Sequence, residues 1–268
     1  MKGSLLLVVT LMLFFNSCEK ESVYEDYQSS TLLRQVRGSE EDMQVLTYYN
    51  TGYIFEHLDR FSYRKFLYNP QNQLIKIEIA MSFNPLSCAI IPGTDFEDGG
   101  DPRKAKMNQY IDYEYSDNGN LKTKNSYFII DGNNQLMNHS EYEYENEQVV
   151  KIKVFNPQDQ LSQYYTYLYD STGNVSKEEY YYTQEGAEAI LQTRILYEYD
   201  DMNNPFKIFA VEGTPGISTN SNNITKQTII DYYTEGDQSH TVENSYEYND
   251  LGYPVKANSY EYIYGEGE

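Results

Sequence analysis

Tyr169-Asp-Ser-Thr-Gly-Asn-Val175 decides the fold, because the same short pattern recurs along the chain. An aromatic residue is followed by Asn, Asp or Ser, then by two variable residues, then by Gly or Asn. After one further residue comes a hydrophobic residue or Pro. Five further copies span residues 68–74, 115–121, 155–161, 199–205 and 248–254. The copy at Phe155 departs by carrying Asp159 in place of Gly or Asn. Repetition on this scale indicates one supersecondary unit that is used many times.

The repeated unit has the chemistry of a tight turn. Asp170 occupies the first turn position, where a short polar side chain can accept a hydrogen bond from the backbone two residues on. Gly173 falls where a type I turn followed by a bulge requires a positive φ, and Asn72 tolerates that conformation in another copy. Residues 131–134 also fit a turn, whereas residues 145–148 fit poorly. The pattern therefore predicts a chain of β-hairpins.

Apolar and charged residues alternate between the turns, as in Glu141-Tyr-Glu-Tyr-Glu145. A period of two is typical of half-buried strands, with aromatic rings on one face and charges on the other. Cross-strand ion pairs of this kind contribute only about 0.2–1 kcal/mol each, so they help to fix register. The bulged turn predicts three cross-strand pairs: Tyr144 with Val150, Glu143 with Lys151, and Glu114 with Lys122.

The turns recur too closely to leave room for helices between them. We therefore predict an all-β fold, a long antiparallel up-and-down meander of about 14 strands that closes into a barrel-like or spiral sheet. A closed sheet of that size has a partly wet interior. The 30 Tyr, 11 Phe and absence of Trp suit this case, because a Tyr ring packs while its hydroxyl stays hydrogen-bonded. We expect the phenol rings inside and the carboxylates outside.

The N-terminus carries a targeting segment. Lys2 precedes an apolar run that ends at Phe15 and is too short for a permanent membrane span. The run ends in Phe15-Asn-Ser-Cys18, which resembles a bacterial lipoprotein signal, although Phe15 and Asn16 depart from the stricter motif. Glu19-Lys-Glu21 resembles the export tag of surface lipoproteins in Bacteroidota. The resemblance implies a lipid on Cys18 and an anchor in the outer membrane, with exposure at the cell surface. A secreted protein with an incidental Cys is the alternative.

These observations predict three segments. Residues 1–17 are the lipoprotein signal peptide, and residues 18–42, which lack a periodic pattern, are a flexible tether. Residues 43–268 form a single Tyr-rich domain of repeated β-hairpins.

The net charge of −21 limits the partners of the chain. An acidic surface repels phosphate backbones and anionic membranes, so we expect no nucleic-acid partner. Cations, neutral glycans and proteins stay open as partners.

Catalytic motifs do not stand out in the sequence. His57, His139 and His240 lie far apart, without metal-ligand spacing. The chain has no nucleophile elbow and no phosphate-binding glycine loop. With 41 acidic residues, any pair of strands supplies two carboxylates, so a glycoside hydrolase is only a distant alternative. We predict that the protein is not an enzyme and has no cofactor.

Two segments interrupt the hairpin rhythm. The first, residues 84–108, has an acidic stretch that is a candidate calcium-binding loop, since hard cations take several oxygen ligands. A solvated acidic loop is the simpler alternative, and the spacing matches no EF-hand. The second, residues 213–223, is rich in Gly, Ser and Asn and is predicted to be flexible; long loops often carry binding residues. The candidate cation ligands are Asp95, Glu97, Asp98 and Asp101.

Two family resemblances follow from these motifs. The unit at Tyr169 and Tyr248-Asn-Asp-Leu-Gly252 resemble the YD repeat of Rhs-type shells, which wind hairpins into a hollow β-structure. The Arg that often follows the Gly in that family is absent here. The whole arrangement resembles uncharacterised Bacteroidota lipoproteins that are described as porin-like in fold, a resemblance that implies no activity.

The predicted function is that of a non-enzymatic cell-envelope lipoprotein, a ligand- or glycan-binding module. The alternative is a structural or interaction subunit of an envelope complex, with a protein partner. A membrane pore fits less well, because Tyr runs through the strand centres and Glu and Lys occupy the opposite face.

Overall fold

The computed structural model describes residues 29–38, 42–59, 62–81, 83–84, 89–90, 105–183, 188–233 and 236–265. These residues form a 17-stranded antiparallel sheet, a small two-stranded sheet and one 3-10 helix. The strands of the large sheet are β1 (Leu33–Arg37), β2 (Asp42–Tyr48), β3 (Ile54–Asp59), β4 (Ser62–Tyr68), β5 (Leu74–Met81), β8 (Gln109–Tyr115), β9 (Leu121–Ile130), β10 (Asn133–Glu145), β11 (Gln148–Phe155), β12 (Leu161–Tyr169), β13 (Val175–Tyr182), β14 (Ile190–Tyr199), β15 (Ile224–Asp231), β16 (Gln238–Glu243), β17 (Tyr246–Tyr248), β18 (Pro254–Ala257) and β19 (Tyr260–Tyr264). The small sheet pairs β6 (Phe83–Asn84) with β7 (Ala89–Ile90), and the helix is η2 (Pro205–Glu212).

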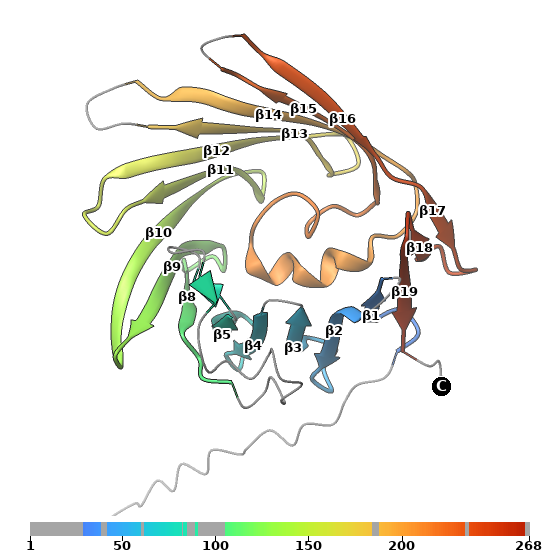
Figure 1. Cartoon of the computed structure of the whole chain (residues 1–268), viewed down its shortest axis with the longest axis horizontal. Coiled ribbons are helices and arrows are strands. Elements are labelled where there is room, and N and C mark those ends of the chain that lie inside the picture. The colour runs from blue at the N-terminus through green and yellow to red at the C-terminus, as the bar shows by residue number, and fades with distance from the viewer. Residues whose placement is uncertain are drawn as a thin grey trace, which may run out of the picture.

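The large sheet is an up-and-down meander that curls around on itself (Figure 1). From β1 to β16 each strand pairs with the next one in sequence, with β5 joined directly to β8. β1 also pairs with β19, which continues the sheet to β18 and β17. The two edge strands of the large sheet are β16 and β17. They follow each other in sequence but do not pair with each other in the described residues. The predicted all-β antiparallel meander is confirmed, and the sheet is barrel-like without being a closed barrel.

The predicted bulged turn forms as expected in the unit at Tyr169. The N–H of Asp170 donates to the carbonyl of Asn174 at 2.8 Å, and the N–H of Gly173 donates back to the carbonyl of Asp170 at 3.2 Å. Gly173 has a φ of 87°, and the Asp170 carboxylate accepts the N–H groups of Thr172 and Asn174. Local side-chain chemistry therefore sets the turn.

One copy of the pattern does not make a hairpin. At residues 199–205 the N–H of Asn203 donates to the carbonyl of Gly252, in a distant turn. The Asn204 side chain then accepts the N–H of Phe206 and caps η2, with Pro205 in the first turn of the helix. The sequence pattern predicted a hairpin turn here, and that prediction was wrong.

The register around Tyr144 agrees only in part with the prediction. Glu143 lies opposite Lys151 as predicted, but Tyr144 lies opposite Val149 instead of Val150. Residues 145–148 form a two-residue turn in which both central residues have positive φ, and a bulge follows. The bulge adds one residue to one strand, so pairing beyond the turn shifts by one position.

The same effect changes the partner of Glu114. This residue lies opposite Thr123, because the bulge after the pair Tyr115–Leu121 leaves Lys122 without an opposite residue. The predicted pair of Glu114 with Lys122 was therefore wrong.

Strand β1 lies within residues 18–42, the segment predicted to be a tether. It pairs with β2 on one side and with β19 on the other, so the first and last strands of the described residues lie side by side in one sheet. The folded domain therefore includes Leu33–Arg37.

Residues 204–223, the inner segment, lie inside the curve of the sheet (Figure 1). Four of its apolar residues pack against the core on the inner side of β1–β5, β8 and the start of β9: Phe206, Ile208, Phe209 and Val211. Asn220 of this segment is fully buried. The predicted flexible insertion is therefore packed and hydrogen-bonded. No helix in the described part of the chain is long and apolar enough to span a membrane.

Aromatic and charged residues occur on both faces of the sheet. Tyr164 and Tyr181 stack on the outer face at a centroid distance of 4.5 Å, with the ammonium of Lys151 over Tyr164. Glu178 lies on the inner face instead, opposite Tyr167. The expectation of rings inside and carboxylates outside is therefore wrong at these positions.

Candidate functional site

A cavity of about 530 Å³ lies between the inner segment and the two sides of the sheet. Its size is in the range of small-molecule sites, which are usually 300–1,000 Å³. We call this cavity the lumen site. It is lined by Gln44, His57, Arg64, Glu178, Tyr197, Phe206, Phe209, Glu212, Thr214, Pro215, Gly216, Ile217 and Ser218.

Strand register brings the charged residues to the lumen site. His57 on β3 lies directly opposite Arg64 on β4, so the two side chains share the inner face. Glu178 on β13 and Tyr197 on β14 reach the cavity from the other side of the curved sheet, and Glu212 ends η2. Residues far apart in sequence therefore meet around one space.

Arg64 and Glu212 form an ion pair that ties the inner segment to the sheet. Nη2 of Arg64 donates to Oε2 of Glu212 at 2.6 Å, and the two side chains are only 19% and 17% exposed. Burial would lower the pKa of Arg64, but the charge of Glu212 and its hydrogen bond raise it. The guanidinium therefore stays charged beside the cavity.

His57 is buried and lacks hydrogen-bond partners. It is 6% exposed, and its ring packs edge-on against Phe209 at 5.0 Å. Neither ring nitrogen has a hydrogen-bond partner in the described residues. Burial, together with the nearby charge of Arg64, lowers the pKa of His57 to about 4, so the ring is neutral at pH 7.

Tyr113 and Lys124 stand next to this group on β8 and β9. They lie directly opposite each other, and the buried hydroxyl of Tyr113 has no hydrogen-bond partner in the described residues. Burial lowers the pKa of Lys124, while the charge of Glu212 raises it and that of Arg64 lowers it further. The part of the chain that the structure describes offers no hydrogen bond or salt bridge to the Lys124 ammonium.

Glu178 and Tyr197 form the polar part of the opposite side. The hydroxyl of Tyr197 donates to Oε2 of Glu178 at 2.9 Å. Burial raises the pKa of Glu178, although this hydrogen bond lowers it. The remaining carboxylate oxygen can accept a hydrogen bond from a ligand.

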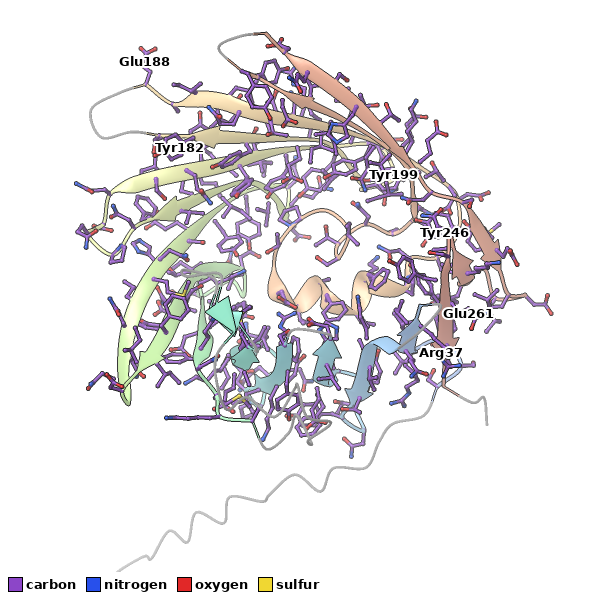
Figure 2. The ribbon with its side chains drawn as sticks, viewed as in Figure 1. Arg37, Tyr182, Glu188, Tyr199, Tyr246 and Glu261 are labelled. Atoms are coloured by element: carbon purple, nitrogen blue, oxygen red, sulfur yellow. The ribbon has the colours of Figure 1, made fainter. Side chains whose placement is uncertain are left out.

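A second cavity, of about 460 Å³, lies at the turn end of the sheet beside the inner segment. Tyr115, Tyr144 and Tyr169 line it, and their hydroxyls already donate to backbone carbonyls of the preceding hairpins, at 2.7–3.0 Å. Tyr199 and Tyr246 do the same further along the sheet, and Figure 2 shows both next to the inner segment, whereas Glu188 stands at the outer rim. These hydroxyls stabilise the sheet, so the lumen site is the better candidate for binding.

The lumen site can offer charges, hydrogen bonds and aromatic faces to a ligand. Within the described residues no group of three or more His, Cys, Asp and Glu could hold a metal ion.

Two sets of residues singled out in the sequence lie outside the described residues, so their roles stay predictions. They are Cys18 and the candidate cation ligands Asp95, Glu97, Asp98 and Asp101.

The sequence interpretation missed the lumen residues, although one signal was present. Arg64-Lys65 and Glu178-Glu179 are adjacent charged pairs within strands. Because successive side chains on a strand point to opposite faces, one member of each pair must face the interior. A buried charge inside a tyrosine-rich sheet is a marker of a site.

Comparisons with known proteins define the fold. No protein-family model matches the chain, and no curated protein sequence matches it. The chain is similar to a porin-like protein from Bacteroides vulgatus ATCC 8482, which is 13% identical, with 90% of this chain and 99% of that chain covered and a TM-score of 0.51. A porin-like protein from Bacteroides uniformis ATCC 8492 is 12% identical over 89% of this chain and 99% of that chain, with a TM-score of 0.37. A protein of unknown function from Bacteroides fragilis NCTC 9343 is 13% identical over 50% and 91%, with a TM-score of 0.36.

The similarity to the Bacteroides vulgatus protein shows a shared fold and nothing more, because the identity is low. The porin-like fold suggested by the sequence is confirmed. The resemblance to YD repeats stays a prediction.

Proposed function

We propose that this protein is a non-enzymatic, lipid-anchored protein of the cell envelope that binds a small ligand in the lumen site. The observation that carries the proposal is His57, which lines the lumen site and whose two buried ring nitrogens have no hydrogen-bond partner among the described residues. Buried polar groups are nearly always hydrogen-bonded, and each exception calls for an explanation. A bound ligand supplies the missing partners.

The shape of the molecule supports binding more than conduction. The inner segment occupies the interior and is tied to the sheet through Arg64 and Glu212. The outer face carries ion pairs in mid-strand, such as Glu179 with Lys177 and Arg194. A wall in contact with lipid would need an apolar band at this place. The outer face is therefore suited to water.

A screen of small ligands tests the proposed function. The chain from Cys18 onward is heated with each member of a panel of sugars, sugar acids, amino acids and nucleosides, and the melting temperature is recorded. A ligand that binds the folded state raises the melting temperature by mass action. The variant Ser218→Trp puts a large ring beside the lumen site and should abolish the shift, whereas Asn118→Trp, at an outer turn, should keep it. A panel without any hit on folded protein would count against binding.

Lipid attachment is tested separately in cells. The wild-type chain should incorporate labelled palmitate and sediment with the outer membrane, and the variant Cys18→Ala should do neither. Equal labelling of both chains would contradict the anchor.

A second candidate, an interaction subunit of an envelope complex, is favoured by strand β16. All six residues of β16 are exposed, and in the described residues the strand pairs only with β15. A free strand edge can accept a strand from a partner. A photo-crosslinker placed at His240 should then trap one protein in stoichiometric amount from intact cells, and a crosslinker at Asn118 should not.

A further inference from the structure

Among the described residues that line the lumen site, Glu178 is the charged group without an ion-pair partner. Glu212 is paired with Arg64 at 2.6 Å, and His57 is neutral at pH 7 because its pKa is lowered to about 4. The Glu178 carboxylate accepts a hydrogen bond from the Tyr197 hydroxyl at 2.9 Å, and burial raises its pKa. The lining of the cavity therefore carries one negative charge that no cation of the described residues balances.

The next residue in sequence shows that strand β13 does pair its carboxylates where cations are present. Glu179 points to the outer face, where its carboxylate contacts Nζ of Lys177 at 3.2 Å and Nη2 of Arg194 at 2.7 Å. Successive side chains of a strand point to opposite faces, so Glu178 points inward, away from both cations. A buried carboxylate without a cation is costly, and a cation that enters the cavity stabilises it.

Tyrosine rings surround Glu178 on the inner face of the sheet. Tyr167 lies directly opposite it on β12, and Tyr197 contacts its carboxylate. Aromatic faces attract cations, because the π-system carries negative charge on its faces. Burial raises the pKa of four hydroxyls on this face, and the charge of Glu178 raises it further: those of Tyr165, Tyr167, Tyr197 and Tyr199.

This arrangement suits a methylated ammonium better than a primary amine. A primary ammonium has three N–H donors, whereas Glu178 has one carboxylate oxygen that is free of the hydrogen bond from Tyr197. A quaternary ammonium has no N–H group to satisfy, and aromatic rings recognise it through its charge and its methyl groups. Its charge is balanced by Glu178 while its methyl groups pack on the rings.

We propose that the lumen site binds a small ligand with a quaternary ammonium group, which sits beside Glu178 and against the ring of Tyr197. The proposal rests on the proposed function of ligand binding and names the class of ligand. The cavity of about 530 Å³ leaves room for the rest of the ligand beside Phe206 and Phe209. The net charge of −21 of the chain favours the approach of a cation.

Calorimetric titration with three probes tests the proposal. The first is choline, and the second is the neutral alcohol in which a tert-butyl group replaces the trimethylammonium group of choline. These two probes have the same shape and differ in charge. The third is ethanolamine, which has the same chain and hydroxyl but lacks the methyl groups. The chain from Cys18 onward should bind choline at least about tenfold more tightly than either of the other two.

Two variants locate the charge that choline recognises. Glu178→Gln removes the charge with little change in shape, and it should lower choline affinity about tenfold while affinity for the neutral alcohol stays unchanged. Glu198→Gln is the matched control, because it also removes one carboxylate, from a side chain that is 64% exposed and paired with Lys226. It should keep wild-type binding. The melting temperature of each variant shows that it is folded.

Two further variants test the ring of Tyr197. Tyr197→Phe keeps the ring and removes the hydroxyl, so its choline affinity should stay within about threefold of wild type. Tyr197→Leu removes the ring, and its choline affinity should be about threefold to tenfold lower than that of Tyr197→Phe. Equal choline affinities of the two folded variants would contradict the contact with the ring.

The outcomes separate the two proposals. Absence of choline binding to folded wild-type protein overturns the quaternary ammonium assignment, and so does equal affinity for choline and either of the other probes. Choline binding that Glu178→Gln leaves unchanged also contradicts it, because the cation would then sit elsewhere. If a ligand of the panel binds instead and Ser218→Trp abolishes its binding, the lumen site stands as a binding site for a different class of ligand. If neither choline nor any member of the panel binds, both proposals fail.

Discussion

The two sides of the curved sheet use the same hairpin unit and have different interiors. The N-terminal wall, formed by β1–β5 and β8, buries Leu46, Phe66 and Ile77 almost completely against the inner segment. The arch, formed by β10–β15, has a smaller core around Ile152 and Tyr167, with half-buried tyrosines beside it. Both sides border the lumen site, but only the N-terminal wall also carries a large apolar core.

The difference shows that the repeat does not decide where the core lies. The hairpins on both sides set the curvature, and the inner segment packs its apolar face on the N-terminal wall only. Arg64 and Glu212 fix it there, while Asn220 ties its far end to the arch. The space left between the inner segment, the arch and the polar edge of the wall at His57 and Arg64 is the lumen site. An insertion of 20 residues (204–223) therefore gives a sheet built from repeats an interior whose two sides differ.

The largest effect should come from emptying the core of the N-terminal wall. Phe66 is 0% exposed, and its truncation to Ala should lower the free energy of unfolding by about 3–5 kcal/mol. Tyr165→Ala in the arch should cost about half as much, since its half-buried ring already borders other tyrosines and open space. Urea unfolding of both variants measures the difference. Equal losses would mean that the arch is packed as tightly as the wall.

His57 should make the wall sensitive to acid. Its pKa is lowered to about 4 in the folded chain and is about 6.5 when unfolded, so below pH 6.5 the unfolded state binds more protons. Stability should therefore fall as the pH drops from 6.5 to 4, by up to about 3 kcal/mol, and this contribution should level off below pH 4.

The variant His57→Leu isolates this contribution. Its difference from the wild type in free energy of unfolding should change over that pH range, whereas the difference for His240→Leu, at an exposed position of β16, should not. A pH-independent difference for His57→Leu would show that the ring is solvated in the folded chain.

Asn220 should matter more than its polar character suggests. It is 0% exposed; its Oδ1 accepts the N–H of Val175 at 2.8 Å, and its Nδ2 donates to the hydroxyl of Tyr199 at 2.8 Å. Asn220→Ala leaves the buried N–H of Val175 without its acceptor and should cost about 1–3 kcal/mol. Ser218→Ala in the same segment removes only a solvent-exposed hydrogen bond to the carbonyl of Thr214 and should change stability by less than about 0.5 kcal/mol. Comparable losses would indicate that the inner segment is not held by the arch.

The repeat made the fold predictable to a large extent. Asp170 and Gly173 carry the chemistry of the turn within seven residues, so hairpins follow from local sequence alone. The hairpin turn predicted at residues 199–205 does not form, and the reason lies outside the turn pattern itself. Pro254 stands in the same place of another copy that does form a hairpin, opposite Tyr248. What differs is the apolar stretch after Pro205, whose packing on the far wall overrides the turn pattern.

The lumen site was less predictable than the fold. The sequence shows that either Arg64 or Lys65 must point inward. It does not show which of them does, because a single bulge shifts by one residue the set of side chains that point inward. It also cannot show that Glu212, 148 residues further along, meets Arg64. That contact depends on how the whole sheet curls, which includes the long-range pairing of β19 with β1.

The smallest predicted effect comes from removing the hydroxyl of a tyrosine that bonds to the neighbouring hairpin, compared with the hydroxyl of a tyrosine on the outer face. The hydroxyl of Tyr144 on the inner face donates to the carbonyl of Leu121 at 3.0 Å, one of a row of such bonds along the turn end of the sheet. Tyr144→Phe keeps the ring and removes the bond, which should lower the free energy of unfolding by about 0.5–1.5 kcal/mol, or the melting temperature by about 2–4 °C. Tyr164 on the outer face is stacked on Tyr181, and Tyr164→Phe preserves that contact, so its melting temperature should stay within about 1 °C of wild type. If the two variants melt together, the row of hydroxyl bonds is not what holds neighbouring hairpins, and the arch must owe its stability to ring packing alone.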